Sequence, residues 1–360
     1  MSFLRRPSRY KHEIGNGVTG AVSQERGLDT VRLFYKNQLP KFGIVLWILV
    51  VGVLFSLLSD RFLQLQNIIN IITQASIIGI LSVSMTFVII TGNGGIDLSV
   101  GSIVGLTSVT MAMLVIPESF FRDTAAMLDI TVTAGQLIFA AGMALLVGLA
   151  AGAINGILVA NVGLPPFIAT LGMMISARGV AAYVSAGMPT YGMPEQIVWL
   201  GQGRLFGVPM PIVVMVLLAL IGHLVLTQTS FGVRVVAIGG NRESARFSGI
   251  RVRSVLIAVF ALNGLLAGIA GLVLAGYGNQ AHPDAGMLYE LYTISAVVVG
   301  GTSLMGGRGA VPGSILGAIL MAEVQNGINI LNVPVAFMQP IVGAMIILAV
   351  VLDQVHRRVN

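Results

Sequence analysis

Long apolar runs separated by short polar stretches dominate the chain from residue 43 onward. A helix that crosses about 30 Å of hydrocarbon needs about 20 apolar residues. Ten segments meet or approach this length, at 43–59, 67–90, 98–117, 134–160, 164–185, 209–227, 254–276, 290–303, 311–331 and 334–352. The eighth is short and the second long, so we expect one or two to be broken or re-entrant. The pattern predicts an all-α polytopic membrane protein with about ten transmembrane helices.

One polar segment, TQTSFGVRVVAIGGNRESARFSGIRVR, interrupts this pattern at 227–253. Within it we predict a short helix near 241–249, with Asn241 as its N-cap and Glu243 in its first turn, where a negative charge suits the helix dipole. Gly249 is placed to end it in the left-handed conformation. A helix of about two turns is unstable alone in water. It therefore needs a partner surface or the membrane face, and the segment indicates a membrane protein driven by another subunit.

Composition supports the membrane class: 56% of the 360 residues are hydrophobic and 9% are charged, against about 25% charged in soluble domains. The chain has 45 glycines, as expected where helices approach closely in lipid. It has no cysteine, which excludes disulfides, thiol catalysis and cysteine-ligated metals. The 42 largely polar residues before the first apolar segment argue against a cleavable signal peptide.

The basic residues predict the orientation. The tail at 1–42 carries eight Lys or Arg, the loop at 228–253 five more, and Arg308, Arg357 and Arg358 complete the set on one side. Only Arg61, Arg122 and Arg204 fall on the other side. By the positive-inside bias, both termini and the 228–253 loop are cytoplasmic. The net charge of +6 therefore follows the membrane topology and does not indicate nucleic acid. We interpret the tail as an arm attracted to anionic lipid, the alternative being a second contact on a partner.

Catalytic motifs are missing from the sequence. There is no G-x-x-x-x-G-K-[ST] phosphate loop, no H-E-x-x-H and no G-x-S-x-G in the loops. The four histidines are scattered. We therefore expect no catalytic residue, metal site or cofactor in this chain.

Two glycine-rich breaks, at 92–95 and 300–309, interrupt apolar runs and resemble each other weakly. Backbone groups that a helix does not pair cannot face lipid, so these breaks must be buried in protein or line a cavity. We expect Asp97 and Ser99 to cap the helix after the first break, and Thr302 and Ser303 to act likewise near the second. Close packing should make Gly95 and Gly301 intolerant of leucine. Asp97 is either a gating residue or a helix N-terminal acid.

Ionisable groups within the other spans are few, and each needs a partner. Arg178 must find a carboxylate or carbonyls, or extend to an interface. Glu323 lies beside Gln325, Asn326 and Asn329, a polar set along one helix. This set favours a polar lining or interhelical hydrogen bonds over a proton relay.

Several motifs together resemble the permease subunits of ribose-type importers, the monosaccharide group of bacterial ATP-binding cassette transporters. The motifs are GGIDLSVGSIVGLT (94–107), FIATLGMMISARGV (167–180), TSFGVRVVAIGGNRESARFSGI (229–250), AVVVGGTSLMGGRG (296–309) and NGINILNV (326–333). They occur in order within a permease domain at 43–353. One departure is Tyr292, where the family often has an acidic residue.

The resemblance implies a permease dimer, either of two copies or of one copy and a homologue, in the inner membrane. It also implies cytoplasmic ATPase subunits and a periplasmic sugar-binding protein. The ATPase-coupling residues would be Gly239, Gly240, Asn241, Arg242, Glu243, Ser244, Ala245, Arg246, Phe247, Ser248 and Gly249. The candidate pathway residues are Gly95, Asp97, Ser99, Thr170, Glu290, Gly300, Gly301, Thr302 and Asn326. The alternatives are a branched-chain amino-acid permease of the same class and a stand-alone secondary carrier.

Overall fold

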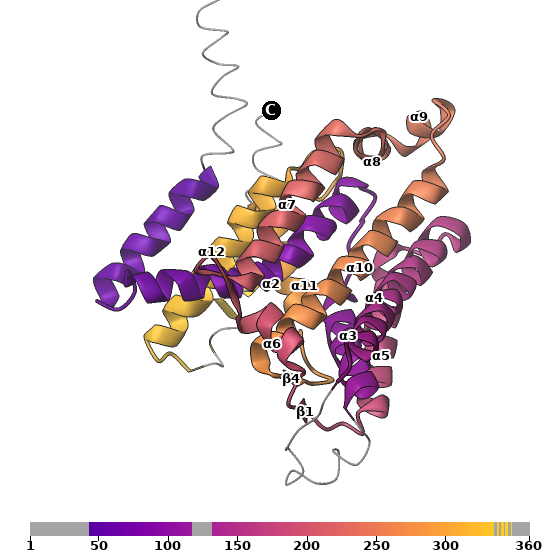
Figure 1. The fold of residues 1–360 in the computed structure, drawn as a ribbon. Helices are drawn as coiled ribbons and strands as arrows, with labels where there is room; N and C mark the ends of the chain where they lie inside the picture. The colour runs from indigo at the N-terminus through magenta and orange to yellow at the C-terminus, as the bar shows by residue number, and fades with distance from the viewer. Residues whose placement is uncertain are drawn as a thin grey trace, which may run out of the picture. The chain divides into compact units, whose positions relative to one another are not determined.

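The computed structural model describes residues 43–116 and 132–334, with a few positions between 337 and 347. The basic tail at 1–42, most of the predicted outer loop at 117–133 and most of the predicted span 334–352 lie outside the described residues. The description below concerns the unit that begins at Ile44. It is almost entirely helical, which confirms the predicted class (Figure 1).

The described helices follow the predicted apolar segments closely. They are Gly43–Leu58, α2 (Leu65–Ile90), α3 (Val100–Val115), α4 (Ala134–Ile157) with a π-helical turn (Leu158–Val162), α5 (Pro166–Val184), α6 (Glu195–Gln202), α7 (Met210–Gln228), α8 (Ser230–Gly240), α9 (Arg242–Phe247), α10 (Val252–Gly278), α11 (Tyr289–Val299) and α12 (Val311–Ile330). Four two-residue strands are β1 (Thr190–Tyr191), β2 (Arg204–Leu205), β3 (Val208–Pro209) and β4 (Gln280–Ala281).

Local sequence sets several helix starts. Thr133 and Gln136 form a capping box at the start of α4, in which each side chain bonds the other residue's backbone N–H. Prolines occupy the first turns of α5, α7 and α12, where the missing N–H costs nothing.

Five of the described helices are long and apolar enough to cross a membrane: α2, α4 with its π-turn, α5, α7 and α10. In the most apolar stretch, 89% of the residues of α2 and 67% of those of α10 are buried, against 22–28% in the other three. Helices α2 and α10 therefore form the centre, and α4, α5 and α7 present most of their apolar side chains outward, as lipid-facing helices do (Figure 1).

Glycines bring α4 and α10 into backbone contact. Gly148, Gly152 and Gly156 recur every fourth residue on α4, and Gly152 lies against the Phe260 carbonyl and Gly264 of α10. Small residues at this spacing let two helices approach within van der Waals reach of each other's backbone. This contact fixes the two helices that carry the buried asparagines described below.

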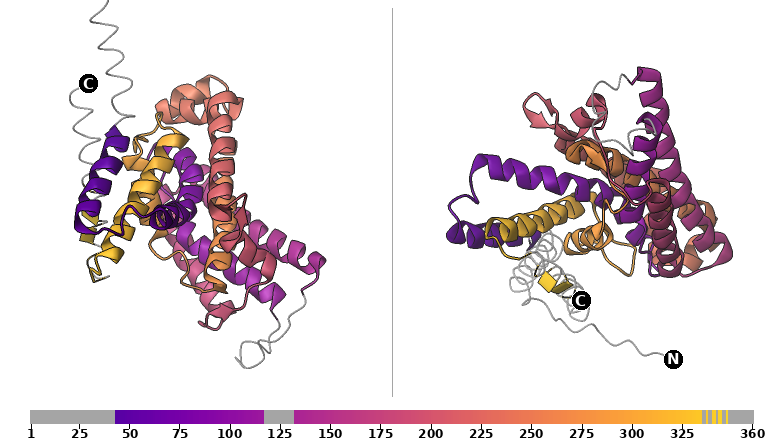
Figure 2. Two further views of the ribbon diagram at one scale, coloured as in Figure 1. Left: turned by 60° about the vertical axis from the view of Figure 1, so that its left-hand side comes forward. Right: turned by 90° about the horizontal axis from the view of Figure 1, so that it is seen from below.

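On the other side of α2, helix Gly43–Leu58 lies along α12, where the Phe55 ring covers Gly327 (Figure 2).

The predicted span at 290–303 is wrong as a full crossing. Helix α11 ends at Val299 and has 11 residues, which is about 16 Å and roughly half of the hydrocarbon thickness. This confirms that at least one segment is broken.

The polar segment at 227–253 also holds one helix more than expected, because α8 precedes α9. The predicted outer loop at 186–208 holds β1, α6, β2 and the first residue of β3. Strands β2 and β3 form a hairpin, and β1 pairs with β4 in antiparallel register, Thr190 opposite Ala281.

Candidate functional site

The short helix predicted in the polar segment is present as α9. The Asn241 side chain accepts a hydrogen bond from the Ser244 amide at 2.9 Å, and Glu243 lies in the first turn. Gly249 has a φ of 83° and ends the turn after the helix. Only Ala245 of α9 is buried, whereas the Phe247 ring is 76% exposed. Helix α9 therefore projects from the bundle with most of its surface exposed.

Figure 1 shows α8 and α9 at the opposite end of the bundle from α6, β1 and β4. The two polar segments at 228–253 and 186–208 thus lie at opposite ends of the membrane-length helices. This arrangement agrees with the side that the basic residues predict for each segment.

Three backbone segments meet at the base of α8 and α9, and we call them the glycine junction: Ile90–Gly92, Gly239–Gly240 and Met305–Gly307. The Gly307 amide donates to the Ile90 carbonyl at 2.9 Å, which joins the second break to the end of α2, just before the first break. A Cβ on Gly92 would lie 2.7 Å from the Met305 carbonyl oxygen. A Cβ on Gly239 would overlap the Ile90 carbonyl and the Gly307 amide. The end of α8 is therefore closely packed against both breaks.

The first break, residues 91–99, leads from the end of α2 to a buried polar cluster of Asp97, Ser99, Asn155 and Asn263. Asp97 Oδ1 accepts from the Ser99 amide at 2.8 Å and from the Ser99 hydroxyl at 2.6 Å. Its Oδ2 accepts from the Asn263 amide at 2.9 Å, and Asn155 donates to the Ser99 hydroxyl at 2.9 Å. All four side chains are fully buried.

This cluster holds the break deep inside the protein. Asn263 lies near the middle of the 27-residue α10, and Asn155 lies near the end of α4. Thr170 of α5 is also buried beside the break, with its hydroxyl 3.4 Å from the Ile96 carbonyl. Non-helical backbone at membrane depth is stable when protein groups satisfy it. Asp97 does so for the Ser99 amide and Thr170 for the Ile96 carbonyl.

The capping predictions for the two breaks are only partly right. Asp97 accepts from an amide just before α3, as predicted, but the Ser99 side chain makes no cap and donates to Asp97 instead. Helix α12 begins after Ala310 with no side-chain cap, so Thr302 and Ser303 do not cap it. Thr302 is buried in the second break, and the loop there is closed by a backbone bond from Ser303 to Arg308.

Gly95 and Gly301, the two glycines predicted to be intolerant of leucine, are restricted for different reasons. Gly95 is closely packed, since a Cβ there would lie 2.5 Å from the Val88 carbonyl. Gly301 has open space around it, so the close-packing prediction is wrong there. Its restriction is a φ of 90°, which favours glycine. Its neighbour Gly300 is the closely packed residue, against Gly313 of α12.

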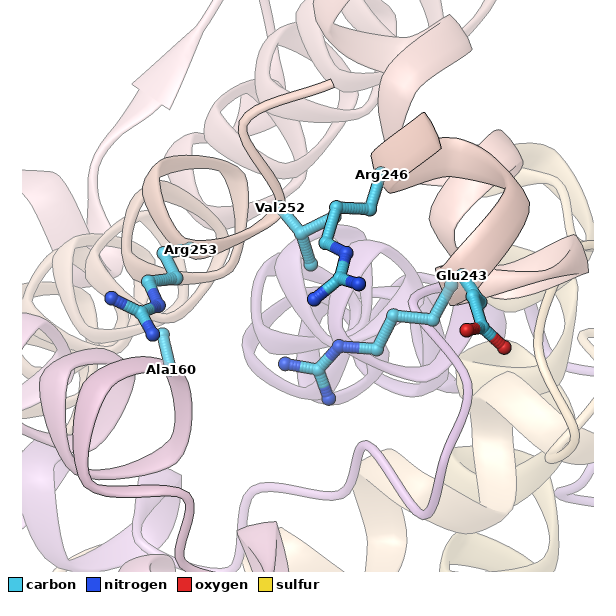
Figure 3. Close-up of a pocket in the computed structure, with 6 residues that line it drawn as sticks. Ala160, Glu243, Arg246, Val252 and Arg253 are labelled. Atoms are coloured by element: carbon cyan, nitrogen blue, oxygen red, sulfur yellow. The ribbon is translucent and has the colours of Figure 1, made fainter. Parts of the chain in front are cut away.

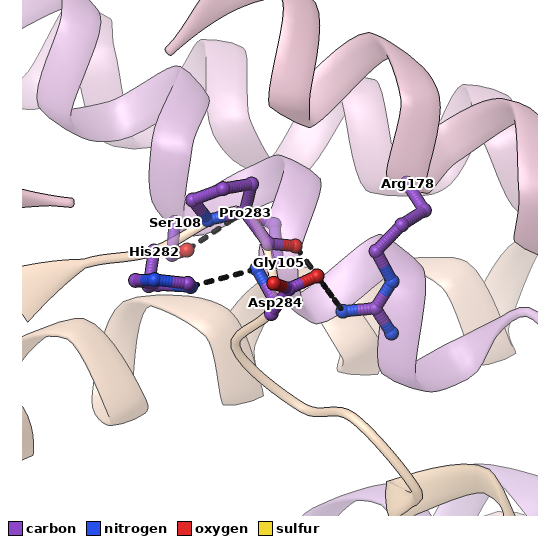
Figure 4. A network of polar contacts seen from close by, with 6 residues as sticks. All are labelled: Gly105, Ser108, Arg178, His282, Pro283 and Asp284. Atoms are coloured by element: carbon purple, nitrogen blue, oxygen red, sulfur yellow. Dashed lines mark hydrogen bonds and ion pairs between the residues drawn. The ribbon is translucent and has the colours of Figure 1, made fainter. Parts of the chain in front are cut away.

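Arg178 and Glu290 lie around the turn at 282–288, between β4 and α11. The Arg178 guanidinium donates to the Pro283 carbonyl at 3.2 Å and lies 3.7 Å from Asp284 (Figure 4). The prediction that Arg178 finds a carbonyl or carboxylate is confirmed. Glu290 is buried in the first turn of α11 and packs against Gly101 of α3. The turn and α11 are thereby tied to the helix that follows the first break.

Asn326 lies apart from both breaks. Its side chain and that of Asn67 on α2 exchange two amide hydrogen bonds, each 3.0 Å long. This confirms the expected interhelical hydrogen bonding for Asn326. It is not confirmed for Glu323 and Gln325, whose Oε2 and Nε2 atoms are buried without a hydrogen-bond partner in the part of the chain that the structure describes. Asn326 does not adjoin the other candidate pathway residues.

Sequence analysis missed Asn155 and Asn263. Each lies in an apolar helix directly before a glycine, in the tetrapeptides INGI and LNGL. An asparagine at that depth in a membrane helix must find a partner in protein, and this was the available signal.

The comparisons with a family model and with curated proteins both identify transport permeases as similar to this chain. The family model described as "Branched-chain amino acid transport system / permease component" matches residues 67–350. The ribose import permease protein of Bacillus subtilis (strain 168) is 36% identical over 325 residues, covering 90% of this chain and 95% of the relative. That of Escherichia coli (strain K12) is 38% identical over 326 residues, covering 89% and 96%. The xylose transport system permease protein of Escherichia coli (strain K12) is 34% identical over 382 residues, covering 89% and 93%.

No solved structure matches the chain. The matches to curated permeases extend over nearly their whole length and confirm the resemblance to permeases of ribose-type importers. The chain therefore belongs to this family of membrane permease components.

Proposed function

We propose that this permease forms the translocation pathway for a monosaccharide or related polyol and is driven by separate cytoplasmic ATPase subunits. The observation that carries the proposal is the contact of the α8 end with both glycine-rich breaks. It connects an exposed helix suited to a partner with the two interrupted segments of the helix bundle. Interrupted membrane helices are typical of transport pathways.

The coupling residues act in two groups. Helix α9, from Arg242 to Phe247, docks on the ATPase, with Asn241 and Gly249 fixing its two ends. Gly239 and Gly240 transmit its movement, because their backbone packs on Ile90 and Gly307. Closure of the ATPase pair on ATP pushes α9, and α8 carries the displacement to the junction.

The displacement then reaches the pathway through the first break. Its far end is held by the Asp97 cluster, so a shift at Ile90–Gly92 bends the break about that anchor. Gly95 lies along the moving stretch, Asp97 and Ser99 belong to the anchor, and Thr170 of α5 lies beside the break. Gly300, Gly301 and Thr302 move with the second break, and Glu290 follows through α3 and α11. The pathway opens alternately to the two sides.

A sugar suits this interior because it is an uncharged polyol. The buried polar groups near the breaks are mainly hydroxyls and amides, and Asp97 already accepts three hydrogen bonds. The names of the relatives, ribose and xylose permeases, support the same class. The description of the matching family supports the alternative, a branched-chain amino acid, since a zwitterion also carries no net charge.

The implied assembly has two permease chains, as a homodimer or with a homologue, in the bacterial inner membrane. A periplasmic sugar-binding protein docks at the α6 and β2–β3 end. Both termini lie in the cytoplasm after about ten crossings, and the basic tail lies on anionic lipid.

Reconstitution in proteoliposomes tests the proposal. The permease is combined with the ATPase and binding protein encoded beside it, and uptake of labelled ribose, xylose and leucine is measured with ATP enclosed. We expect uptake of a sugar that stops when a hydrolysis-deficient ATPase is used. Leucine uptake in its place would support the amino-acid alternative, and uptake without any ATPase would refute ATP-driven transport.

A further inference from the structure

An open cavity of about 390 Å³ lies between α9 and the adjoining ends of α4 and α10. It is lined by Ala160, Arg242, Glu243, Arg246, Val252 and Arg253. Figure 3 shows Arg246 and Arg253 extending toward this space from α9 and α10, while the Glu243 carboxylate points away from it.

The cavity is lined by three arginines and one carboxylate, that of Glu243, so its lining carries a net positive charge. Within the described ranges, the only ion pair is Arg178 with Asp284, so none of the three arginines forms a salt bridge with Glu243 or another carboxylate. Like charges gathered around a cavity repel one another, and an anion placed among them removes this cost. The planar guanidinium fork matches the oxygens of a phosphate group.

The surroundings of the cavity resemble the edge of a membrane. Ala160 belongs to the π-helical turn that ends α4, and Val252 is the first residue of α10. Along α4 toward the cavity, Ile154, Ile157 and Val162 are exposed. This apolar face suits acyl chains, and the arginines lie on α9 and in the first turn of α10, beside the end of α4. Basic pockets between helix ends at a membrane surface bind anionic lipid headgroups.

We propose that this cavity binds the phosphate of an anionic phospholipid headgroup, with Arg242, Arg246 and Arg253 as its ligands. The lipid bridges α9 to the ends of α4 and α10, and so braces the docking helix from its membrane side. Ala245 alone gives α9 little buried contact of its own, and a bound headgroup supplies a second attachment. The proposal does not depend on which solute the permease carries.

The test measures lipid binding by the purified full-length protein in detergent, using a fluorescent phosphatidylglycerol. Arg253→Gln is the main variant, because Arg253 lines the cavity and lies outside α9. Arg253→Lys keeps the charge. Arg234→Gln is the matched control, since Arg234 is an exposed arginine of α8 that does not line the cavity. Thermal unfolding confirms that each variant is folded.

We expect phosphatidylglycerol to bind more tightly than phosphatidylcholine. Arg253→Gln should weaken binding about five-fold, which corresponds to about 1 kcal/mol for one basic residue. Arg253→Lys keeps the charge but loses the guanidinium fork, so its affinity should lie between those of the wild type and Arg253→Gln. Arg234→Gln should bind nearly as the wild type does.

Three results would overturn the proposal. One is equal affinity of the wild type and Arg253→Gln, and another is an equal loss in Arg234→Gln, which would indicate diffuse attraction. The third is full displacement of the lipid by inorganic phosphate or by the ATPase subunit, which would assign the cavity to a free anion or to the partner protein.

Discussion

Replacing Gly239 with alanine tests the transmission step of the proposed mechanism. The added methyl group would overlap the Ile90 carbonyl and the Gly307 amide, both of which are backbone groups. Neither can rotate away as a side chain could. Either α8 separates from the two breaks, or the 2.9 Å bond from Gly307 to Ile90 is lost.

The expected cost can be estimated. Overpacking of this kind costs about 1–3 kcal/mol, and loss of the backbone bond adds about 0.5–1.5 kcal/mol. The higher helix propensity of alanine returns about 1 kcal/mol. We therefore expect Gly239→Ala to destabilise the junction by about 1–3 kcal/mol, as the balance of these terms. Gly240→Ala is the matched control, because nothing lies within 4 Å of a Cβ there.

The assay combines uptake in proteoliposomes, thermal unfolding and co-purification with the ATPase. Gly239→Ala should lower uptake and melting temperature while the ATPase still co-purifies, because α9 itself is unchanged. Gly240→Ala should match the wild type in all three. Normal uptake in Gly239→Ala, or equal damage in both variants, would refute transmission through this junction.

Three further predictions concern the buried Asp97 cluster, the hydrogen-bonded pair of Asn67 and Asn326, and the orientation of the chain in the membrane. Asn263→Leu removes the donor to Asp97 Oδ2 and should lower the stability against thermal unfolding by about 1–3 kcal/mol. Adding Asp97→Asn should recover part of this stability, and no recovery would contradict the assigned hydrogen bond. A double-mutant cycle on Asn67 and Asn326, each changed to alanine, should give a coupling of about 0.6–1.7 kcal/mol, whereas zero coupling would show that their two hydrogen bonds do not contribute to stability. The chain has no cysteine, so single introduced cysteines report the topology. Ser244→Cys should react with a membrane-impermeant maleimide only after permeabilisation, whereas Gln202→Cys should react from outside. Labelling of position 244 from outside would contradict the predicted orientation.

The features predicted well are those set by neighbouring residues. Asn241, Ser244 and Gly249 lie within nine residues of one another, so the cap and the end of α9 follow from local rules. The apolar segments likewise predict the long helices, because the need to span hydrocarbon acts on each run separately.

The features missed depend on contacts between distant segments. Asp97 and Asn263 are 166 residues apart, and Asn155 and Ser99 are 56 apart. The sequence shows that each buried polar group needs a partner but does not identify it. The glycine junction is of the same kind, since Gly239 meets Ile90 and Gly307 only in the folded protein. The reason for glycine at position 301 was predicted wrongly, because a positive φ and close packing both favour glycine and the sequence does not distinguish them.

Cross-linking from α9 tests the central claim most directly. Ser244→Cys, exposed on α9, and Gln202→Cys, exposed at the end of α6, are each given a short photo-activatable cross-linker in membranes that contain the whole assembly. The account predicts that position 244 cross-links to the ATPase subunit and position 202 does not. Failure of position 244 to reach the ATPase, with the complex intact, would contradict the assignment of α9 as the docking helix.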